Sequence, residues 1–326
     1  MKSKVLEVRD LTVHFYTYAG IVKAIEKVSF DVYMGETFAL VGETGCGKSV
    51  TARALTQLIE SPGRIVGGEV YYTSDKGRVD LLKLSEEEIR KIRGSEIAYI
   101  FQDPQSSLDP LYTIGYQISE ALYVHKRVEN LKDGIKKAVE ILRTVLMPDP
   151  EKRVSNYPHE MSGGMKQRAT IGIGISNNPK LLIADEPTTA LDVTVQTQIL
   201  DLIKDMKERY GATVILITHD MGVVAGMADR VGVMYAGKIV ELGDVYAIFK
   251  KPLHPYTQGL LRAVPNPLVK IERLETIPGT VPSLINPPEG CRFSPRCPLA
   301  SSICREKTPE LVELEDGHFV ACHNVG

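Results

Sequence analysis

The sequence predicts an α/β fold, built on a mostly parallel sheet, with a small irregular appendage at the C-terminal end. Strand-like and helix-like segments alternate between residues 164 and 217, which is typical of parallel strands joined by helices. The apolar segment Thr37–Val41 runs directly into a glycine-rich turn. Beyond about Phe249, frequent prolines break up any long helix or central strand. We therefore expect two domains, residues 1–250 and 251–326.

Hydrophobic periodicity predicts the individual elements of the larger domain. A hairpin is expected at Gly67–Leu82, interrupted at residues 74–77, and a helical subdomain at Ile114 to about Leu146, ended by Pro148 and Pro150. The expected strands are Val5–Phe15, Ala24–Val32, Thr37–Val41, Ile97–Phe101, Leu181–Ala184 and Thr213–Ile217. The other expected helices are Val50–Ile59, Gly164–Ser176 and Val193–Arg209.

Composition narrows the classes of function. The 326 residues are 43% hydrophobic and 25% charged, with a formal net charge of -2 and no long block of one sign. This balance disfavours a nucleic-acid partner and disorder. The N-terminal segment lacks the pattern of a secretory signal, and no apolar run approaches the roughly 20 residues that a membrane helix needs. We expect a cytosolic protein that reaches a membrane only through a partner.

Gly42–Ser49 reads GETGCGKS and fits the phosphate-loop pattern G-x-x-x-x-G-K-[ST], between a strand and a helix. Its glycines allow a tight turn whose N–H groups face phosphate oxygens, and the helix N-terminus adds partial positive charge. Lys48 is expected to reach the β and γ phosphates of a nucleotide, and Ser49 to offer its hydroxyl to Mg²⁺. These residues predict a nucleotide site.

The second half of that site is predicted where the apolar strand Leu181–Ala184 leads into Asp185 and Glu186. Asp185 is expected to hold Mg²⁺ through water. Glu186 stands where a general base would polarise the water that attacks the γ phosphate. The sequence thus predicts ATP hydrolysis as well as binding.

Three further motifs flank the carboxylate pair. Ser162–Met165 opens a helix with small residues, which exposes backbone N–H groups and a hydroxyl to an anion. Gln102 follows a predicted strand before it, and His219 follows the strand Thr213–Ile217 after it. Each signal is weak alone, but their order is specific.

In this order the motifs resemble those of an ATP-binding cassette (ABC) ATPase, with Gln102 as Q-loop, Ser162–Met165 as signature, residues 190–192 as D-loop and His219 as H-loop. The resemblance covers residues 1 to about 245. It implies a RecA-like core with an antiparallel β subdomain and a helical subdomain. It also implies a head-to-tail dimer, in which the phosphate loop of one subunit and the signature of the other enclose each ATP.

The resemblance assigns roles to single residues. Glu186 would be the base, His219 the γ-phosphate sensor, Gln102 a link between the metal and a membrane subunit, and Asp192 a contact across the dimer. The residues expected on this basis to contact nucleotide or Mg²⁺ are Tyr16, Gly42, Glu43, Thr44, Gly45, Cys46, Gly47, Lys48, Ser49, Val50, Gln102, Ser162, Gly163, Gly164, Met165, Asp185, Asp192 and His219.

Two details of this site stay open in the sequence. Phe15, Tyr16 and Tyr18 compete as the aromatic that stacks on adenine, and Tyr16 is favoured. The signature reads Met161-Ser-Gly-Gly-Met165 instead of the common LSGGQ. Because backbone and serine contacts would do most of the binding, we expect this change to tune function and not to abolish it.

Cys46 lies inside the phosphate loop, near a helix N-terminus. Such a position can lower the pKa of a thiol and raise its reactivity, which predicts inhibition by alkylation. The alternative is a small side chain that the loop tolerates.

The C-terminal part carries a second resemblance. The segment from His254 to Leu261 (HPYTQGLL) is similar to one that marks ATPase subunits of bacterial oligopeptide and dipeptide importers. That subfamily also carries a cysteine-rich end, and some members bind an iron–sulfur cluster there. The corresponding cysteines in this sequence are Cys291, Cys297, Cys304 and Cys322.

Four thiolates in a proline-rich appendage can stabilise it by coordinating a metal. Their spacings fit neither a standard zinc ribbon nor a ferredoxin pattern, so geometry does not identify the metal. The resemblance implies one [4Fe–4S] cluster, with zinc or no metal as alternatives. His318 and His323 are near enough in sequence to be alternative ligands.

The leading hypothesis is a subunit that hydrolyses ATP to power dipeptide or oligopeptide import, at the cytoplasmic face of the membrane. Its expected partners are a second ABC ATPase subunit, identical or paralogous, two membrane-spanning permease subunits and an extracytoplasmic peptide-binding protein. An importer of nickel or another solute is the alternative, since related importers share the appendage. A soluble ABC ATPase acting on ribosomes or DNA is disfavoured, because the chain has one cassette and no basic excess.

Overall fold

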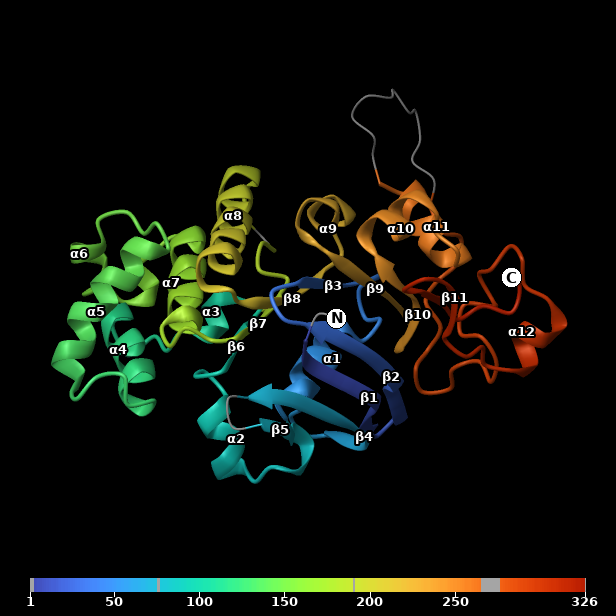
Figure 1. Cartoon of the computed structure of the whole chain (residues 1–326), viewed down its shortest axis with the longest axis horizontal. Coiled ribbons are helices and arrows are strands. Elements are labelled where there is room, and N and C mark those ends of the chain that lie inside the picture. The colour runs from blue at the N-terminus through green and yellow to red at the C-terminus, as the bar shows by residue number, and fades with distance from the viewer. Residues whose placement is uncertain (1–2, 75–76, 190, 265–275, 326) are drawn as a thin grey trace. The chain divides into compact units, whose positions relative to one another are not determined.

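The computed structural model describes residues 3–74, 77–189, 191–264 and 276–325 (Figure 1). The chain divides into two compact units, one formed by Met1–Lys83 with Leu216–Gly326 and the other by Leu84–Ile215. Parts of the predicted motifs lie outside the described residues, namely Asp75, Lys76, Ala190, Pro265 and Pro267.

The first unit contains a four-stranded antiparallel sheet in the order β2-β1-β4-β5. Val8 on β1 lies opposite Phe30 on one neighbour and Val70 on the other, and all three are buried. This is the pairing that alternating apolar residues predict, and the predicted hairpin of β4 and β5 is confirmed. The strands are β1 (Lys4–Thr17), β2 (Gly20–Tyr33), β4 (Gly63–Ser74) and β5 (Gly77–Asp80).

The first unit also holds part of a larger mixed sheet, with its strands in the order β11-β12-β10-β9-β3. β3 is buried at all of its positions and runs parallel to β9, while β9, β10, β12 and β11 pair antiparallel. β8 (Thr213–Thr218) crosses in sequence from the second unit into the first. The strands of this mixed sheet that belong to the first unit are β3 (Thr37–Val41), β9 (Arg230–Tyr235), β10 (Lys238–Asp244), β11 (Val312–Glu315) and β12 (His318–Val320).

The C-terminal appendage shares a hydrophobic core with this sheet. Tyr256 and Phe293 pack in one cluster with Val41 of β3 and Tyr235 of β9. The buried carboxylate of Glu241 on β10 accepts hydrogen bonds from the N–H groups of residues 253 and 254, which satisfies a charge that would be costly to bury alone. The helices here are α9 (Met221–Met227), α10 (Val245–Lys250), α11 (Pro255–Arg262) and α12 (Ser302–Glu306). The domain boundary at residue 250 stays a prediction.

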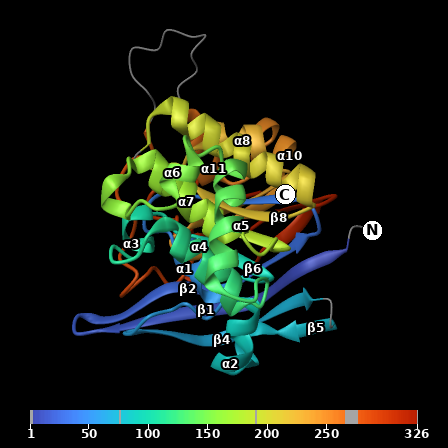
Figure 2. The ribbon, with the colours of Figure 1, turned by 90° about the vertical axis from the view of Figure 1, so that its left-hand side faces the viewer.

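The second unit combines two parallel strands with a group of helices. β6 pairs with β7 so that Ala98 lies opposite Leu182. Helices α4 to α7 gather in one group (Figure 2), which confirms the predicted helical segment from Ile114. The elements are α2 (Glu86–Ile92), β6 (Ile97–Ile100), α3 (Pro104–Ser107), α4 (Ile114–Val124), α5 (Leu131–Thr144), α6 (Pro150–Arg153), α7 (Gly163–Ile175), β7 (Leu181–Asp185) and α8 (Val193–Tyr210).

The helix after the phosphate loop begins and ends earlier than predicted. α1 spans Lys48–Leu55, where the sequence predicts Val50–Ile59. It begins directly after Gly47, whose left-handed backbone forms the N-cap. It ends before Gln57, a non-glycine residue with φ of 56°, because such a conformation interrupts a right-handed helix.

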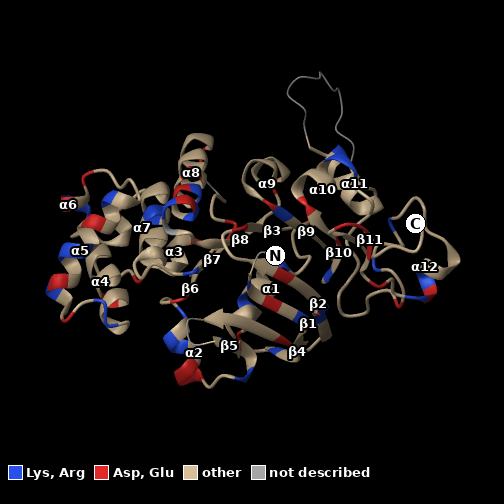
Figure 3. Cartoon of the chain, in the orientation of Figure 1, with Lys and Arg blue, Asp and Glu red and all other residues tan. Residues whose placement is uncertain are grey.

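Charged residues of both signs occur on helices such as α5 and α8 (Figure 3). This agrees with the absence of long single-sign blocks in the sequence. Among the described residues, no helix is both long enough and apolar enough to span a membrane.

Candidate functional site

The phosphate loop passes so close to neighbouring backbone that two of its positions need glycine. A Cβ on Gly42 would lie 2.2 Å from the carbonyl oxygen of Met234, and one on Gly47 would lie 2.9 Å from that of Ala24. Both glycines also have positive φ, 152° and 104°, which L side chains rarely adopt. Glycine is therefore required at these two positions by the available space as well as by the sequence motif.

Lys48 is buried at the start of α1 and is directed back into the loop. Its Nζ donates to the carbonyl oxygens of Gly42 at 2.8 Å and Glu43 at 3.2 Å. An ammonium held against the loop carbonyls is suited to meet phosphate oxygens. Thr51 closes the first helical turn by donating to the carbonyl of Gly47 at 2.9 Å.

The rest of the loop differs in exposure. Thr44 and Gly45 are exposed at the tip, while Ser49 and Val50 are half-buried in the first turn of α1. Ser49 thus presents a hydroxyl oxygen, which is a ligand type that Mg²⁺ accepts.

Glu43 is fixed at three points, two of which come from the C-terminal appendage. Its N–H donates to the hydroxyl of Tyr256 at 2.9 Å. Its carboxylate accepts both arms of the Arg296 guanidinium, from Nη1 at 2.7 Å and from Nη2 at 3.1 Å. Its carbonyl accepts from Lys48, as described above. No role is predicted for Tyr256 or Arg296 from the sequence motifs.

The carboxylate pair lies in the second unit, at the end of β7. Asp185 is buried, and the hydroxyl of Tyr99 on β6 donates to its Oδ2 at 2.7 Å. A charge-assisted bond of this length orients the carboxylate and offsets part of its desolvation. Carboxylate oxygens are ligands that Mg²⁺ prefers, so Asp185 fits the predicted metal role.

Glu186 follows immediately in a left-handed backbone conformation, with φ of 45°. This conformation costs a non-glycine residue about 1–2 kcal/mol, so the backbone at Glu186 is strained, and this strained turn sets the direction of its side chain. Gln102 donates from Nε2 to Glu186 Oε2 at 2.7 Å, and the hydroxyl of Thr189 donates to the same oxygen at 3.0 Å. The structure therefore brings Gln102 and Glu186 together, as one site requires.

The signature segment opens α7 of the second unit. Ser162 is exposed and forms the N-cap, with its Oγ accepting from the N–H of Met165 at 3.4 Å. Gly163 is exposed, and a Cβ on Gly164 would come within 2.9 Å of Val195 on α8. Gly164 therefore allows the first turns of α7 and α8 to approach closely.

Asp192 caps α8, and its Oδ1 accepts from the N–H of Val195 at 3.0 Å. Its side chain is exposed, as is that of His219 in the first unit, directly after β8. Tyr16 lies near the end of β1, 43% exposed, with the guanidinium of Arg64 5.3 Å from its ring centroid. The roles of these three residues stay predictions.

Cys46 corrects one prediction. Its side chain is almost fully buried, and this burial raises the pKa of the thiol despite the neighbouring Lys48. The position of the thiol near a helix N-terminus predicts a lowered pKa. Desolvation is the larger effect, so the expected lowering of the pKa is wrong, and burial favours the alternative of a small side chain that the loop tolerates.

The structure does not support the predicted metal site in the appendage. Within the described ranges, no group of three or more His, Cys, Asp or Glu side chains is arranged to hold a metal ion. Burial, together with the neighbouring Cys304, Cys322 and Cys297, raises the pKa of Cys291 to about 11. Of the alternative ligands, His318 is buried against Glu241 at 2.8 Å and His323 contacts the carbonyl of Lys307 at 2.8 Å.

Four contacts around the site were missed by sequence reasoning, those of Tyr99, Thr189, Tyr256 and Arg296. Tyr256 and Arg296 are 213 and 253 residues away from Glu43 in the chain. No periodicity or motif links positions so far apart. The one available signal was that Tyr256 belongs to the segment similar to peptide importers.

Comparisons with known proteins agree with this geometry. A protein-family profile described as "ABC transporter" matches residues 25–189, and one described as "Oligopeptide/dipeptide transporter, C-terminal region" matches residues 240–304. The two profiles therefore cover the phosphate loop with the carboxylate pair, and most of the appendage.

Curated relatives match nearly the whole chain. A probable peptide ABC transporter ATP-binding protein of Sinorhizobium fredii is 52% identical over 97% of this chain and 94% of its own length. The oligopeptide transport ATP-binding protein OppD of Bacillus subtilis is 50% identical over 98% and 88%. The dipeptide transport ATP-binding protein DppD of Escherichia coli is 46% identical over 98% and 96%.

Solved structures share the fold of the larger part of the chain. A dimeric post-hydrolysis state of the ATP-binding cassette MJ0796, bound to ADP and Pi, has a TM-score of 0.65 at 27% identity. It covers 74% of this chain and 98% of the other. CbiO1 of Clostridium perfringens, part of an ABC transporter complex, has a TM-score of 0.61 at 28% identity and covers 77% and 92%.

We expect Cys46 of the folded, nucleotide-free protein to resist iodoacetamide, because the thiol is buried and its pKa is raised. Peptide mass spectrometry after brief treatment should find Cys46 unmodified, and labelling should become complete in denaturant. Rapid labelling of Cys46 in the folded state would contradict the burial argument.

Proposed function

The chain belongs to the ABC transporter family and carries the oligopeptide/dipeptide transporter C-terminal region, and on this premise we propose that it hydrolyses ATP to power peptide import. The observation that carries the proposal is one chain with a complete phosphate loop and near full-length similarity to peptide transport ATP-binding proteins. ATP is the substrate, and its hydrolysis drives the transporter.

Within this proposal the phosphates of ATP bind in the loop of residues 42–49. Lys48 supports this role because its ammonium is already held against the loop carbonyls. Ser49 and Asp185 would hold Mg²⁺, which neutralises phosphate charge when bound. Both offer the hard oxygen atoms that this ion prefers.

Glu186 accepts the proton of the attacking water. Support comes from its two hydrogen bonds, from Gln102 and Thr189, which both hold Oε2 and fix the carboxylate in one orientation. A general base needs such positioning before its basicity matters. Gln102 is thus a positioning residue in the site, in addition to the transporter link that the family resemblance assigns it.

A working site needs a second ATPase subunit, identical or paralogous. Ser162, Gly163, Asp192 and His219 support this proposal, since all four are exposed although the family resemblance gives each a nucleotide or dimer role. The dimeric form of the similar cassette MJ0796 is in line with it. Tyr16 remains the favoured aromatic for adenine.

The other proposed partners are two membrane-spanning permease subunits and an extracytoplasmic peptide-binding protein, with this chain at the cytoplasmic face of the membrane. The names of the relatives, which refer to dipeptide and oligopeptide transport, favour peptides over nickel. A soluble ATPase acting on ribosomes or DNA gains no support from these names.

One [4Fe–4S] cluster in the appendage is part of the proposal. It rests on the resemblance of the cysteine-rich end alone, because the four thiols form no ligand group in the structure. No step of ATP hydrolysis depends on it.

We expect Glu186→Gln to lower the rate of phosphate release by about 100-fold or more while ATP binding is retained. The amide keeps the size of the side chain but cannot take a proton from water. Glu208→Gln, an exposed position on α8, is the matched control and should hydrolyse ATP at the wild-type rate. Wild-type turnover by Glu186→Gln would remove the base from this account.

The cluster is tested by iron and sulfide analysis of anaerobically purified protein, with its visible absorption spectrum. If the resemblance holds, the protein is brown and loses iron on Cys297→Ser. Colourless, iron-free protein from an anaerobic preparation would reject the cluster and leave the ATPase proposal unchanged.

A further inference from the structure

The phosphate loop is attached to the appendage through a single residue, Glu43. This is the first residue after Gly42, so its backbone forms part of the phosphate cradle. The appendage holds Glu43 from two directions, by Tyr256 at the backbone N–H and by Arg296 at the carboxylate. Any movement of these two side chains therefore acts on the loop directly.

The Arg296–Glu43 pair is better defined than a surface ion pair. The Arg296 side chain is only 5% exposed, and the pair is bidentate. The guanidinium also donates to the carbonyls of Ile277 and Pro278 and to the hydroxyl of Tyr235. A planar guanidinium held by this many acceptors has little conformational freedom. An exposed ion pair is not held in this way.

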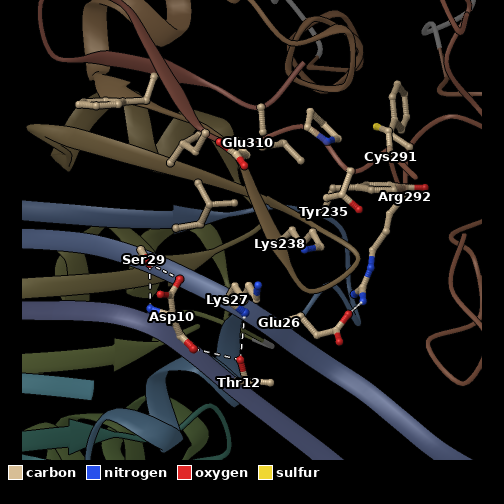
Figure 4. Close-up of a pocket in the computed structure, with 18 residues that line it drawn as sticks. Asp10, Thr12, Glu26, Lys27, Ser29, Tyr235, Lys238, Cys291, Arg292 and Glu310 are labelled. Carbon is tan, nitrogen blue, oxygen red and sulfur yellow. Dashed lines mark hydrogen bonds and ion pairs between the residues drawn. The ribbon is translucent and has the colours of Figure 1, made fainter. Parts of the chain in front are cut away.

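The loop that carries Arg296 is itself anchored on the core of the first unit. Arg292, four residues earlier, contacts the carbonyl of Ala236 and the carboxylate of Glu26 on β2. Figure 4 shows Arg292 extending toward Glu26 along a pocket of about 740 Å³, with Cys291 beside Tyr235. The segment between Cys291 and Cys297, which carries Arg296, is thus anchored to the first unit by Arg292.

The negative charge of Glu43 explains why its pairing with Arg296 matters for nucleotide binding. A carboxylate on the phosphate loop repels the phosphates that the loop has to bind. Arg296 offsets that charge and directs the carboxylate toward the appendage. Without Arg296 the loop would carry an unpaired negative charge next to its ligand.

We propose that Arg296 is a positioning residue for ATP binding, acting through Glu43 to hold the phosphate loop and to cancel its negative charge. The proposal rests on the ATPase function proposed above and extends it to a residue of the appendage. It predicts that the appendage affects the affinity for ATP more strongly than it affects the rate of the chemical step.

The test measures Kd for MgATP and the KM and kcat of hydrolysis for a set of purified full-length variants. Arg296→Ala is expected to raise Kd and KM about ten-fold, with a smaller change in kcat. Arg296→Lys keeps the charge but not the fork and should recover part of the loss. Adding Glu43→Gln to Arg296→Ala should also recover affinity, because the repelling charge is then gone.

Arg305→Ala is the matched control, since Arg305 is exposed in the same appendage, and it should bind ATP as the wild type does. Recovery by Glu43→Gln is the decisive readout, because a general loss of folding would not be reversed by it. Unchanged Kd and KM in Arg296→Ala, or equal impairment of the single and double variants, would overturn the proposal while ATP hydrolysis stands. If the wild type neither binds nor hydrolyses ATP, the proposed function fails and this inference with it.

Discussion

The confinement of the phosphate loop between two stretches of backbone is the constraint on which the nucleotide site depends. Gly42 lies against the carbonyl of Met234, and Gly47 lies against the carbonyl of Ala24. No side chain fits at either position without a clash, so both positions need glycine. In the resulting conformation the carbonyl of Gly42 accepts a hydrogen bond from Lys48, and the N-terminus of α1 lies at the phosphate site.

The same constraint explains why the C-terminal appendage is close to the chemistry. Met234 belongs to β9, and β9 packs through Tyr235 against Tyr256 and Phe293 of the appendage. The strand that confines the loop therefore also supports the residues that hold Glu43. The appendage and the phosphate loop form one packed unit, although they are far apart in sequence.

Features that are contiguous in the chain are the ones that the sequence predicts. The loop of residues 42–49, the strand before Asp185 and the helical segment from Ile114 were each found from local pattern, and the structure confirms the strand and helix. β9 and the strands after it were not predicted. The contact between Glu43 and Arg296 was out of reach because it depends on tertiary packing.

One local argument failed for a physical reason. A thiol near a helix N-terminus has a lowered pKa only if it keeps some solvation, and Cys46 is buried. Burial is a property of the whole fold, whereas the helix position is visible in the sequence. For the four cysteines of the appendage, the spacing in the sequence does not identify a metal.

Equilibrium dialysis of the purified chain against a non-hydrolysable ATP analogue with Mg²⁺ tests the central claim most directly. The account predicts saturable binding of one nucleotide per chain, weakened about 100-fold by Lys48→Ala and unaffected by Lys204→Ala, an exposed position on α8. Equal affinity in Lys48→Ala and the wild type would show that the nucleotide binds elsewhere and would contradict the account.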